Sequence, residues 1–230
     1  MTSSTTRIAL ITGASRGLGL ALARALAERG WSLIIDARGS AALEEARAAL
    51  ARRTRVVALP GDIMDEAHRA ALAAAVRTVG GLDLLVNNAS ALGPSPLPPL
   101  LAYPLDALAG VYRTNVIAPL ALLQAVAPLM TPGARVINVS SDAGVEAYEG
   151  WGGYGSSKAA LDHLSAVLAV ENPGFRVYAV DPGDMRTAMQ QEAFPGEDIS
   201  DRPLPEESVP GLLRLIDEDA PSGRYQSRES

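Results

Sequence analysis

The 230-residue chain contains no cysteine and only two histidines, His68 and His163. Without cysteine there is no disulfide, no thiolate nucleophile and no cysteine-ligated zinc site. Two histidines far apart in the sequence are a poor basis for a metal site, so we predict no bound metal. The chemistry must then come from hydroxyls, amides, carboxylates, lysines or a bound cofactor.

Long hydrophobic runs and clusters of basic residues are also missing. No apolar run reaches the ~20 residues that span a bilayer, and the first residues lack the pattern of a signal peptide, so we expect a cytoplasmic protein. The formal net charge is -6. An acidic chain without basic clusters lacks the surface that attracts nucleic acid or an anionic membrane, so neither is expected as a partner.

Apolar residues make up 48% of the chain, which suits a single domain spanning 1-230. Short apolar runs rich in β-branched residues alternate with longer Ala/Leu/Arg segments of helical period. The predicted strands are RIALIT, SLIID, RVVAL, LDLLVN, RVINVS and FRVYAVD, and SGRYQS is a short strand or tail. The predicted helices are 18–29, 41–53, 65–79, 105–130, the segment after Tyr154 and SVPGLLRLIDED.

This alternation predicts an α/β fold. Strands that are apolar throughout are buried on both faces, which is typical of parallel sheets covered by helices on both sides. Repeated βα units with right-handed crossovers then give a Rossmann-type, doubly wound parallel sheet.

Two long loops interrupt the alternation. The segment 89–104 is rich in proline and follows the fourth strand, and the segment 194–208 is acidic and follows the sixth. Ligands in open α/β sheets bind at the carboxyl ends of strands, where long loops often act as lids. We therefore predict a substrate-loop region near 184-210; surface insertions without a role are the alternative.

A glycine turn, ITGASRGLG, lies between the first strand and the first helix. Its TGxxxGxG spacing differs from the GxGxxG dinucleotide pattern, but the physical role is the same. Gly13 permits a tight turn, while Gly17 and Gly19 let the backbone approach a diphosphate at the helix N-terminus. A tight connection without a ligand is the simpler explanation for the turn alone, but its position at the first crossover favours a dinucleotide site.

The end of the second strand offers both Asp36 and Arg38. A carboxylate there bonds the ribose hydroxyls of NAD, whereas an arginine accommodates the extra phosphate of NADP. Arg16, just before Gly17, would complete a two-arginine clamp for that phosphate. We therefore favour NADP(H). NAD(H) stays open because of Asp36, unless the alternation of the strand turns its side chain to the other face.

Tyr154 and Lys158 in YGSSK are four positions apart and so share one face of the predicted helix. An ammonium within ~4 to 6 Å stabilises phenolate and would lower the tyrosine pKa from ~10, bringing proton transfer close to neutral pH. Ser140 and Ser141 end the preceding strand, and Ser141 would donate a hydrogen bond to a substrate oxygen. Such a pair is also common on ordinary helix faces, and it is the glycine turn that gives it weight.

The chain resembles the short-chain dehydrogenase/reductase family over nearly its whole length. The motifs that carry the resemblance are, in order, TGASRGLG, Gly61-Asp62, NNAS at 87–90, Asn115, Ser140-Ser141, YGSSK, and DPG at 181–183 with Thr187 following. The resemblance implies hydride transfer between a nicotinamide and a carbonyl carbon. Tyr154 would give a proton to the oxygen during reduction or remove it during oxidation.

The resemblance also implies roles for single residues. The implied catalytic residues are Asn115, Ser141, Tyr154 and Lys158, with Asn115 keeping a helix bend and a proton-relay water in place. The implied cofactor-binding residues are Gly13, Ser15, Arg16, Gly17, Leu18, Gly19, Arg38, Asp62, Ile63, Asn87, Ala89, Tyr154, Lys158, Pro182, Gly183 and Thr187. Among these, Asp62 and Ile63 would hold the adenine. Asn87 and Ala89 would line the adenosine side, and Pro182, Gly183 and Thr187 would surround the nicotinamide.

Two features depart from the family pattern. Ser90 stands where the family usually has glycine, which re-aims the backbone or leaves the side chain pointing outward. The C-terminal SGRYQSRES is a poor version of the glycine-rich strand with which many members build a tetramer. We therefore expect a homodimer through the helices that begin near Leu105 and Tyr154, with a tetramer still open. The leucines that would face the two-fold axis, or else only cover the sheet, are Leu161, Leu164 and Leu168.

An apolar and aromatic substrate pocket is expected. The predicted substrate residues are Ser141, Trp151, Met185 and Met189, joined by Leu92, Tyr148 and Phe194, with packing beneath a lid as the alternative. Arg186 is the nearest candidate for holding an anion, or it faces solvent. The expected reaction is reduction of a small to medium ketone or aldehyde. The rivals are an NAD-linked alcohol dehydrogenase and a non-catalytic protein that senses the NADP redox state.

Overall fold

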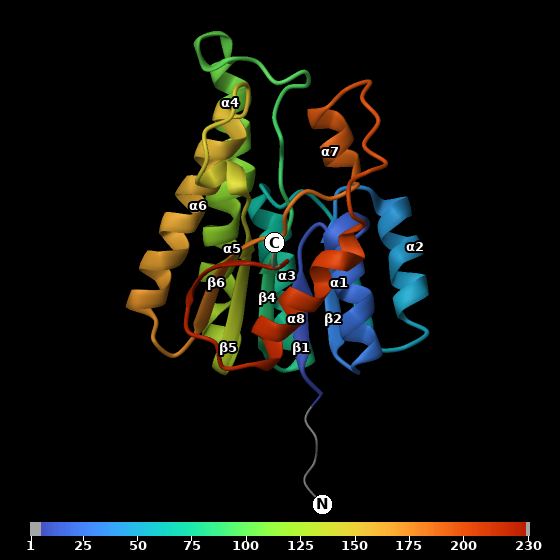
Figure 1. Ribbon diagram of the computed structural model, residues 1–230. Helices are drawn as coiled ribbons and strands as arrows, with labels where there is room; N and C mark the ends of the chain where they lie inside the picture. The colour runs from blue at the N-terminus through green and yellow to red at the C-terminus, as the bar shows by residue number, and fades with distance from the viewer. Residues whose placement is uncertain (1–5, 229–230) are drawn as a thin grey trace, which may run out of the picture.

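The computed structural model describes residues 6–228, so the ends of the predicted domain lie outside the described residues. Seven strands form one sheet in the order β3-β2-β1-β4-β5-β6-β7, and every neighbouring pair is parallel (Figure 1). The strands are β1 (Ile8–Ile11), β2 (Ser32–Ala37), β3 (Val56–Pro60), β4 (Leu82–Asn87), β5 (Met130–Val139), β6 (Arg176–Asp181) and β7 (Gly223–Gln226). The predicted fold, a single Rossmann-like domain, is confirmed.

Helices cover both faces of the sheet (Figure 1). The α-helices are α1 (Gly17–Glu28), α2 (Ser40–Leu50), α3 (Glu66–Val79), α4 (Leu105–Tyr112), α5 (Ala118–Val126), α6 (Gly152–Glu171), α7 (Ala188–Ala193) and α8 (Val209–Asp217). The shorter turns are η1 (Leu100–Ala102), η2 (Arg113–Ile117), η3 (Ala127–Leu129), η4 (Asp142–Gly144) and η5 (Pro205–Ser208). Within residues 6–228, no helix combines the length and apolar character needed to cross a membrane.

Two apolar cores lie on the two faces of the sheet. One core holds the buried residues of α1, α2 and α8, and the other holds those of α3 and α5. Neighbouring strand residues divide between them, since Ile11 belongs to the first core and Leu10 to the second. This is the arrangement expected for strands that are apolar throughout.

The carboxyl ends of the strands meet at one edge. Ile11 pairs with both Ile35 and Val86, and Asn87 pairs with Asn138. The strand order reverses at β1, with β2 and β3 on one side and β4 to β7 on the other. In open α/β sheets, ligands bind in the crevice that this reversal opens outside the strand ends.

The prediction of one helix over 105–130 is wrong. The segment divides into α4, a π-helical turn (η2), α5 and η3, and β5 already begins at Met130. Asn115 in η2 explains the interruption, because its side chain bonds the loop after β4. The amide of Ala91 donates to Asn115 Oδ1 at 2.8 Å, and Asn115 Nδ2 donates to the Ala91 carbonyl at 2.9 Å.

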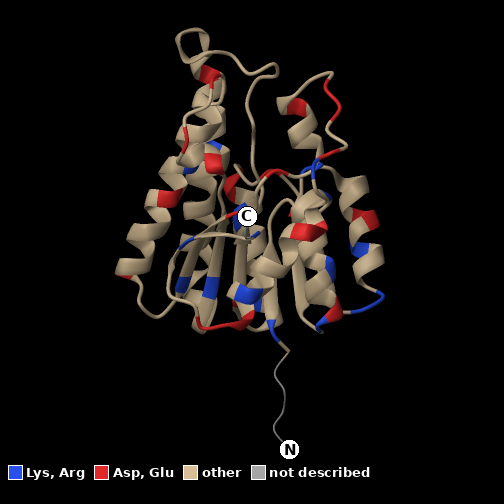
Figure 2. Cartoon of the chain, in the orientation of Figure 1, with Lys and Arg blue, Asp and Glu red and all other residues tan. Residues whose placement is uncertain are grey.

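The two long loops rise above the carboxyl edge and contact each other. The loop after β4 contains η1, and the loop after β6 contains α7, a helix that the sequence analysis does not predict (Figure 1). The Ser95 hydroxyl donates to the Glu192 carbonyl at 2.7 Å, which joins the two loops. Acidic residues gather in the segment that follows α7 (Figure 2).

Candidate active site

The glycine turn after β1 is fixed by the segment after β4. Gly13 has φ +66°, and a Cβ placed there would lie 3.0 Å from both Ala89 Cα and Asn88 Nδ2. Only glycine suits this position. Asn88 Nδ2 also donates to the carbonyls of Thr12 and Gly13, at 2.8 and 3.2 Å. Two further predicted members lie in this segment, half-buried Ser15 in the turn and buried Leu18 in α1.

Helix α1 begins at Gly17, where the turn ends. A Cβ on Gly17 would meet only Thr187 Cγ2, at 3.7 Å, whereas one on Gly19 would lie 2.5 Å from Asn88 Nδ2. Arg16, the N-cap residue, makes no side-chain hydrogen bond to the first turn. An uncapped N-terminus presents its amides and the positive end of the helix dipole to a ligand. This donor set fits the diphosphate of a dinucleotide.

Asp36 at the end of β2 points into the protein and is 1% exposed. Its Oδ1 accepts a hydrogen bond from the Gly13 amide at 2.9 Å, and its Oδ2 lies 3.0 Å from His68 Nε2 on α3. Arg38 and Arg16 are both exposed. Of Asp36 and Arg38, the two residues predicted to choose between NAD and NADP, only Arg38 therefore lies open to a ligand.

The predicted adenosine-side residues lie at the ends of β3 and β4. Asp62 Oδ1 accepts the backbone amide two residues further on at 2.9 Å, and Ile63 is buried in the second core. Asn87 is buried and bonded across to β5 at 2.7 Å. The amide of Ala89 donates to the Thr12 hydroxyl at 2.9 Å. These contacts place all four residues along the carboxyl edge.

Tyr154 and Lys158 lie together on α6, as their spacing predicts. They are 8% and 2% exposed, and Lys158 Nζ lies 5.4 Å from the centroid of the Tyr154 ring. The ammonium donates to the Val139 carbonyl at the end of β5, at 2.7 Å. The Trp151 ring packs edge-on against Tyr154, with ring centroids 5.7 Å apart. The sheet edge and the loops thus hold both side chains in place.

Burial raises the pKa of Tyr154 above its ordinary value. The carboxylates of Asp142 and Asp181 raise it further, while hydrogen bonds with Ser90 and Ser141 lower it. The direction is opposite to the lowering that the sequence analysis expects from the neighbouring ammonium. Removal from water favours the neutral phenol, and among the chain's own groups this effect is the largest.

Burial also acts on Lys158, whose pKa it lowers to about 8, while the Asp162 carboxylate opposes this change. An ammonium with this pKa releases its proton more readily than an exposed lysine. Lys158, which can release its proton near neutral pH, therefore lies beside the phenol of Tyr154, which stays protonated.

Ser141 and Ser90 both lie within hydrogen-bonding reach of Tyr154. The Ser141 hydroxyl donates to Asp142 Oδ1 at 2.8 Å and accepts from the Ala143 amide at 3.2 Å. The Ser90 hydroxyl donates to Asn115 Oδ1 at 3.1 Å and therefore points inward rather than outward.

Asn115 connects three segments and is 1% exposed. Besides its two bonds to Ala91, its Nδ2 donates to the Ser157 hydroxyl on α6 at 2.9 Å. Asn115 lies in η2, a π-helical turn between α4 and α5. The helix bend and the proton-relay water expected at this residue stay predictions.

The loop after β6 carries the residues predicted to surround a nicotinamide. The Gly183 amide donates to Asp181 Oδ1 at 2.9 Å, and the Ser208 hydroxyl donates to the Pro182 carbonyl at 2.7 Å. Thr187 caps α7 through its hydroxyl and reaches the glycine turn through its methyl group. Hydrogen bonds thus hold this loop near its start, at Pro182 and Gly183, and near its end, at Ser208.

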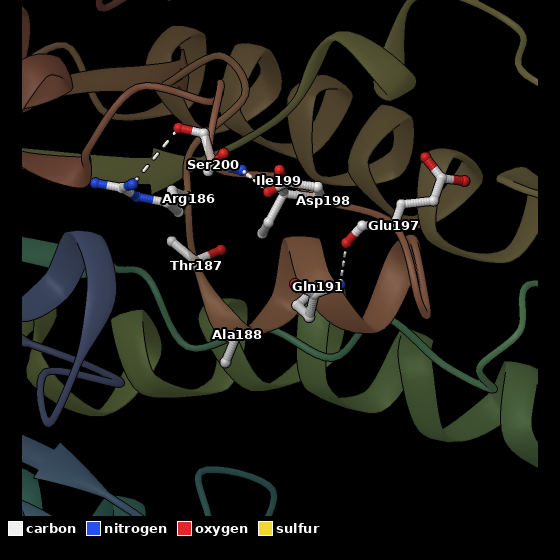
Figure 3. Close-up of a pocket in the computed structure, with 8 residues that line it drawn as sticks. All are labelled: Arg186, Thr187, Ala188, Gln191, Glu197, Asp198, Ile199 and Ser200. Atoms are coloured by element: carbon white, nitrogen blue, oxygen red, sulfur yellow. Dashed lines mark hydrogen bonds between the residues drawn. The ribbon is translucent and has the colours of Figure 1, made fainter.

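A cavity of about 420 Å³ lies between α7 and the segment that follows it (Figure 3). It is lined by Arg186, Thr187, Ala188, Gln191, Glu197, Asp198, Ile199 and Ser200. Gln191 Nε2 donates to the Glu197 carbonyl at 3.0 Å, and Arg186 Nη1 donates to the Ser200 carbonyl at 3.5 Å. Thr187 borders both this cavity and the glycine turn, so the cavity adjoins the crevice.

The predicted substrate residues separate into two groups. A small apolar cluster consists of Leu92, Ala143, Tyr154 and Ala193, with Leu97, Trp151, Met189 and Phe194 packed against it. Met185 packs against the first core instead. Tyr148 is exposed, and its hydroxyl bonds Glu146 and Asp142 at 2.9 and 3.1 Å. The structure therefore brings Trp151 and Met189, but not Met185, beside Tyr154.

Sequence reasoning missed three residues that hold this edge: Thr12, Asn88 and His68. Thr12 precedes Gly13 and Asn88 follows Asn87, so their positions within the motifs are a usable signal. His68 has no such signal, because its partner lies 32 positions away in the chain.

One edge of the parallel sheet carries the glycine turn, the uncapped N-terminus of α1 and the buried Tyr154 and Lys158. This combination is typical of a dinucleotide-dependent oxidoreductase. A family model described as short chain dehydrogenase matches residues 7–198. The chain belongs to the short-chain dehydrogenase family.

Individual relatives and solved structures are consistent with this family. A rhamnolipids biosynthesis 3-oxoacyl-[acyl-carrier-protein] reductase of Pseudomonas aeruginosa is 37% identical, covering 80% of this chain and 74% of the relative. The structure of a short chain dehydrogenase from Shigella flexneri complexed with NADP superposes with a TM-score of 0.88 at 28% identity, covering 97% of each chain. An NAD+-bound xylitol dehydrogenase superposes with a TM-score of 0.85 at 25% identity, covering 96% of each.

Proposed function

We propose that this protein is an NADP(H)-dependent reductase of small to medium apolar ketones or aldehydes. The observation that carries the proposal is the buried Tyr154 with the Lys158 amine 5.4 Å from its ring centroid, beside Ser141 and at the same edge as the glycine turn. The 3-oxoacyl reductase among the relatives supports a carbonyl as the reacting group.

A bound nicotinamide supplies the hydride and, when oxidised, a positive charge near the tyrosine. Tyr154 gives its proton to the substrate oxygen, and Ser141 donates a hydrogen bond that stabilises the charge developing there. Lys158 would hold the ribose of the bound cofactor and would pass a proton toward Tyr154, which its pKa of about 8 permits near neutral pH. Because burial raises the pKa of Tyr154, the phenol stays protonated, which suits reduction.

The first turn of α1 and the glycine turn would hold the diphosphate. We assign the adenosine side to Asp62, Ile63, Asn87 and Ala89, and the nicotinamide side to Pro182, Gly183 and Thr187. The region near 184-210 would form one wall of the substrate site, and Trp151 and Met189 would line it.

NADP(H) is favoured over NAD(H) by the contacts of Asp36. Its carboxylate is bonded to Gly13 and His68, so it is not available to ribose hydroxyls. Arg38 and Arg16 are exposed and would bind a phosphate dianion. Arg38→Ala should then reduce NADPH affinity by about tenfold with little change for NADH, measured by cofactor fluorescence. Equal losses for both cofactors would favour the NAD-linked alternative.

Turnover is tested by NADPH oxidation with a panel of aliphatic and aromatic ketones and aldehydes. Tyr154→Phe should lower kcat/KM by roughly 10²- to 10⁴-fold while NADPH binding stays within about twofold. Tyr225→Phe is the matched control, since the hydroxyl of this tyrosine donates to the Pro221 carbonyl and lies outside the Tyr154 cluster. NADPH binding by the wild type without turnover of any carbonyl would instead support a redox sensor.

We also propose that the protein forms a homodimer in the cytoplasm. A groove of about 470 Å³ between α5 and α6 is lined largely by apolar residues, including Leu164, Val167 and Leu168. Leu161, by contrast, is buried against the protein itself. Val167→Glu should shift the mass measured by light scattering to that of a monomer, whereas the control Leu101→Glu, at another exposed apolar residue, should not. A wild-type monomer would refute the dimer.

A further inference from the structure

Arg224 on β7 reaches the active site from the edge of the sheet. It pairs with Ala179 in the strand register, and its guanidinium contacts three segments at once. Its Nε donates to Asp162 Oδ2 on α6 at 3.0 Å, and its Nη2 donates to the Ser141 carbonyl at 3.0 Å. The same Nη2 lies 3.5 Å from Asp181 Oδ2 at the end of β6.

Each of these partners is next to a reacting group. Ser141 carries the hydroxyl proposed to bond the substrate oxygen. The negative charge of Asp181 acts on Tyr154, and that of Asp162 acts on Lys158. One arginine therefore contacts the Ser141 turn and two of the three carboxylates that act on Tyr154 and Lys158.

A second arginine of the same segment extends the contact to the nicotinamide loop. Arg228 Nε donates to the Pro182 carbonyl at 3.2 Å, and its Nη2 donates to the Asp184 carbonyl at 2.6 Å. The C-terminal segment is thus bonded to the turn after β5 and to the loop after β6.

The chemistry of the contacts requires arginine. A planar guanidinium offers donors in fixed directions, so it can bond a carbonyl and two carboxylates together, whereas an ammonium offers a single point of charge. Asp181 is 3% exposed, and a buried carboxylate without a cation is costly. The residue that covers it must therefore stay charged at every working pH.

We propose that Arg224 is a positioning residue for the reaction: it holds the Ser141 turn in place and neutralises Asp162 and Asp181 beside Lys158 and Tyr154. The proposal rests on the reductase function proposed above. It also gives the C-terminal strand a role in each subunit that does not depend on a tetramer.

The proposal predicts the direction of a change in pH dependence. The carboxylates acting on Tyr154 and Lys158 are Asp142 from η4, Asp181 from β6 and Asp162 from α6, and Arg224 from β7 is the cation paired with the last two. Removing the only cation of this set leaves the carboxylates uncompensated. They then favour the protonated forms of Tyr154 and Lys158, so the rise of alcohol oxidation with pH should move to higher pH.

The test compares Arg224→Met and Arg224→Lys with Arg176→Ala in the full-length protein. Arg176 is the matched control, because it pairs with Asp219 at 2.8 Å and starts β6, at the end of that strand away from the active site. The probe is the ketone or aldehyde that the wild type reduces fastest, together with its alcohol. Arg224→Met should lower kcat about tenfold with the KM for NADPH nearly unchanged, and should raise the midpoint of the oxidation profile by roughly 0.5 to 1 pH unit.

Arg224→Lys keeps the positive charge but loses the forked donors of the guanidinium. The midpoint of its oxidation profile should therefore match that of the wild type, while kcat stays low. Hydrogen exchange of peptides covering 141–146 provides a readout that needs no turnover. Exchange there should be faster in Arg224→Met than in the wild type and unchanged in Arg176→Ala. Should Arg224→Met fail to fold, the same measurements on Arg224→Lys decide, with kcat and exchange as the readouts.

Unchanged exchange in a folded Arg224 variant would overturn the positioning of the Ser141 turn. A midpoint that does not move in Arg224→Met, or that moves equally in Arg176→Ala, would overturn the electrostatic role. A wild type that turns over no carbonyl would refute the proposed function alone, and the exchange measurement would still decide whether Arg224 holds the turn.

Discussion

Asp36 is the last but one residue of β2, in the half of the sheet proposed to bind the nucleotide (the nucleotide half). Asp181 ends β6, in the half proposed for catalysis (the catalytic half). They are 1% and 3% exposed, and each accepts a hydrogen bond from a glycine amide at 2.9 Å. Their basic partners differ. Asp36 bonds the buried imidazole of His68 at 3.0 Å, whereas Asp181 lies 3.5 Å from the more exposed guanidinium of Arg224.

The difference follows from what each half has to do. In the nucleotide half, an imidazole N–H satisfies the carboxylate by hydrogen bonding, and the pair holds a turn in shape. In the catalytic half, burial raises the pKa of Asp181, and its charge acts on Tyr154, the proposed proton donor. There the partner is a permanent cation, so that the electrostatic balance does not change with pH.

The largest expected effect on stability is that of Asp36→Ala. The change leaves the Gly13 amide and the His68 ring without their buried partner, so the free energy of unfolding should fall by roughly 3 kcal/mol. Urea unfolding measures it, with Asp219→Ala as control, since that carboxylate is exposed in its ion pair and should cost less than about 1 kcal/mol. Equal losses of stability would mean that the buried Asp36–His68 pair contributes no more than an exposed ion pair.

Gly13 and Gly183 sharpen the same comparison. Both have positive φ, +66° and +68°, so alanine should cost about 1 to 2 kcal/mol at either position. At Gly13 the new Cβ would also press on the backbone of Ala89, but at Gly183 it would meet the flexible end of Arg228. Thermal unfolding should therefore show the greater loss for Gly13→Ala, and the reverse order would contradict the account of the turn.

Lys158→Met tests whether the buried ammonium in the catalytic half lowers the stability of the fold. The pKa of Lys158 is lowered to about 8, so below that pH the folded protein holds an ammonium that burial disfavours. The variant should be more stable at pH 7 by about 1 to 2 kcal/mol, net of the lost bond to Val139. The gap should close between pH 8 and the unfolded value near 10.5, and a gap independent of pH would refute the assignment.

The smallest effect is expected for His68→Gln. Glutamine can still donate to Asp36 without carrying charge, so stability should change by less than about 1 kcal/mol, and the pH dependence of activity should not change. Urea unfolding and a pH profile measure both. A loss as large as that of Asp36→Ala would show that the pair depends on charge rather than on a hydrogen bond.

Local sequence patterns predict much of this fold. Continuous apolar runs identify six strands, and the short β7 is one of the two alternatives predicted for its segment. The failures come from contacts between distant segments. The segment 105–130 is periodic enough for one helix, but the bonds of Asn115 to Ala91 impose a π-helical turn. Helix α7 has only six residues and starts at the Thr187 cap, so it is too short for periodicity to identify.

The site shows the same limit. The spacing of Tyr154 and Lys158 correctly predicts that they lie together, but spacing carries no information about burial. Burial sets the direction of both pKa changes, so the predicted lowering for Tyr154 is wrong for the chain's own groups. The inward orientation of Asp36 was allowed by strand alternation, but its partner could not be inferred, because no local pattern links β2 to His68.

The hydrogen bond from Ser95 to Glu192 has a consequence for redesign. It joins two segments that lie almost a hundred positions apart in the chain and that both overhang the catalytic edge. Transplanting either segment alone from another enzyme would leave a hydroxyl or a carbonyl without its counterpart. It would also disturb the small apolar cluster against which Leu97 and Phe194 both pack. Altered selectivity is therefore best sought by exchanging 89–104 and 188–208 as a matched set.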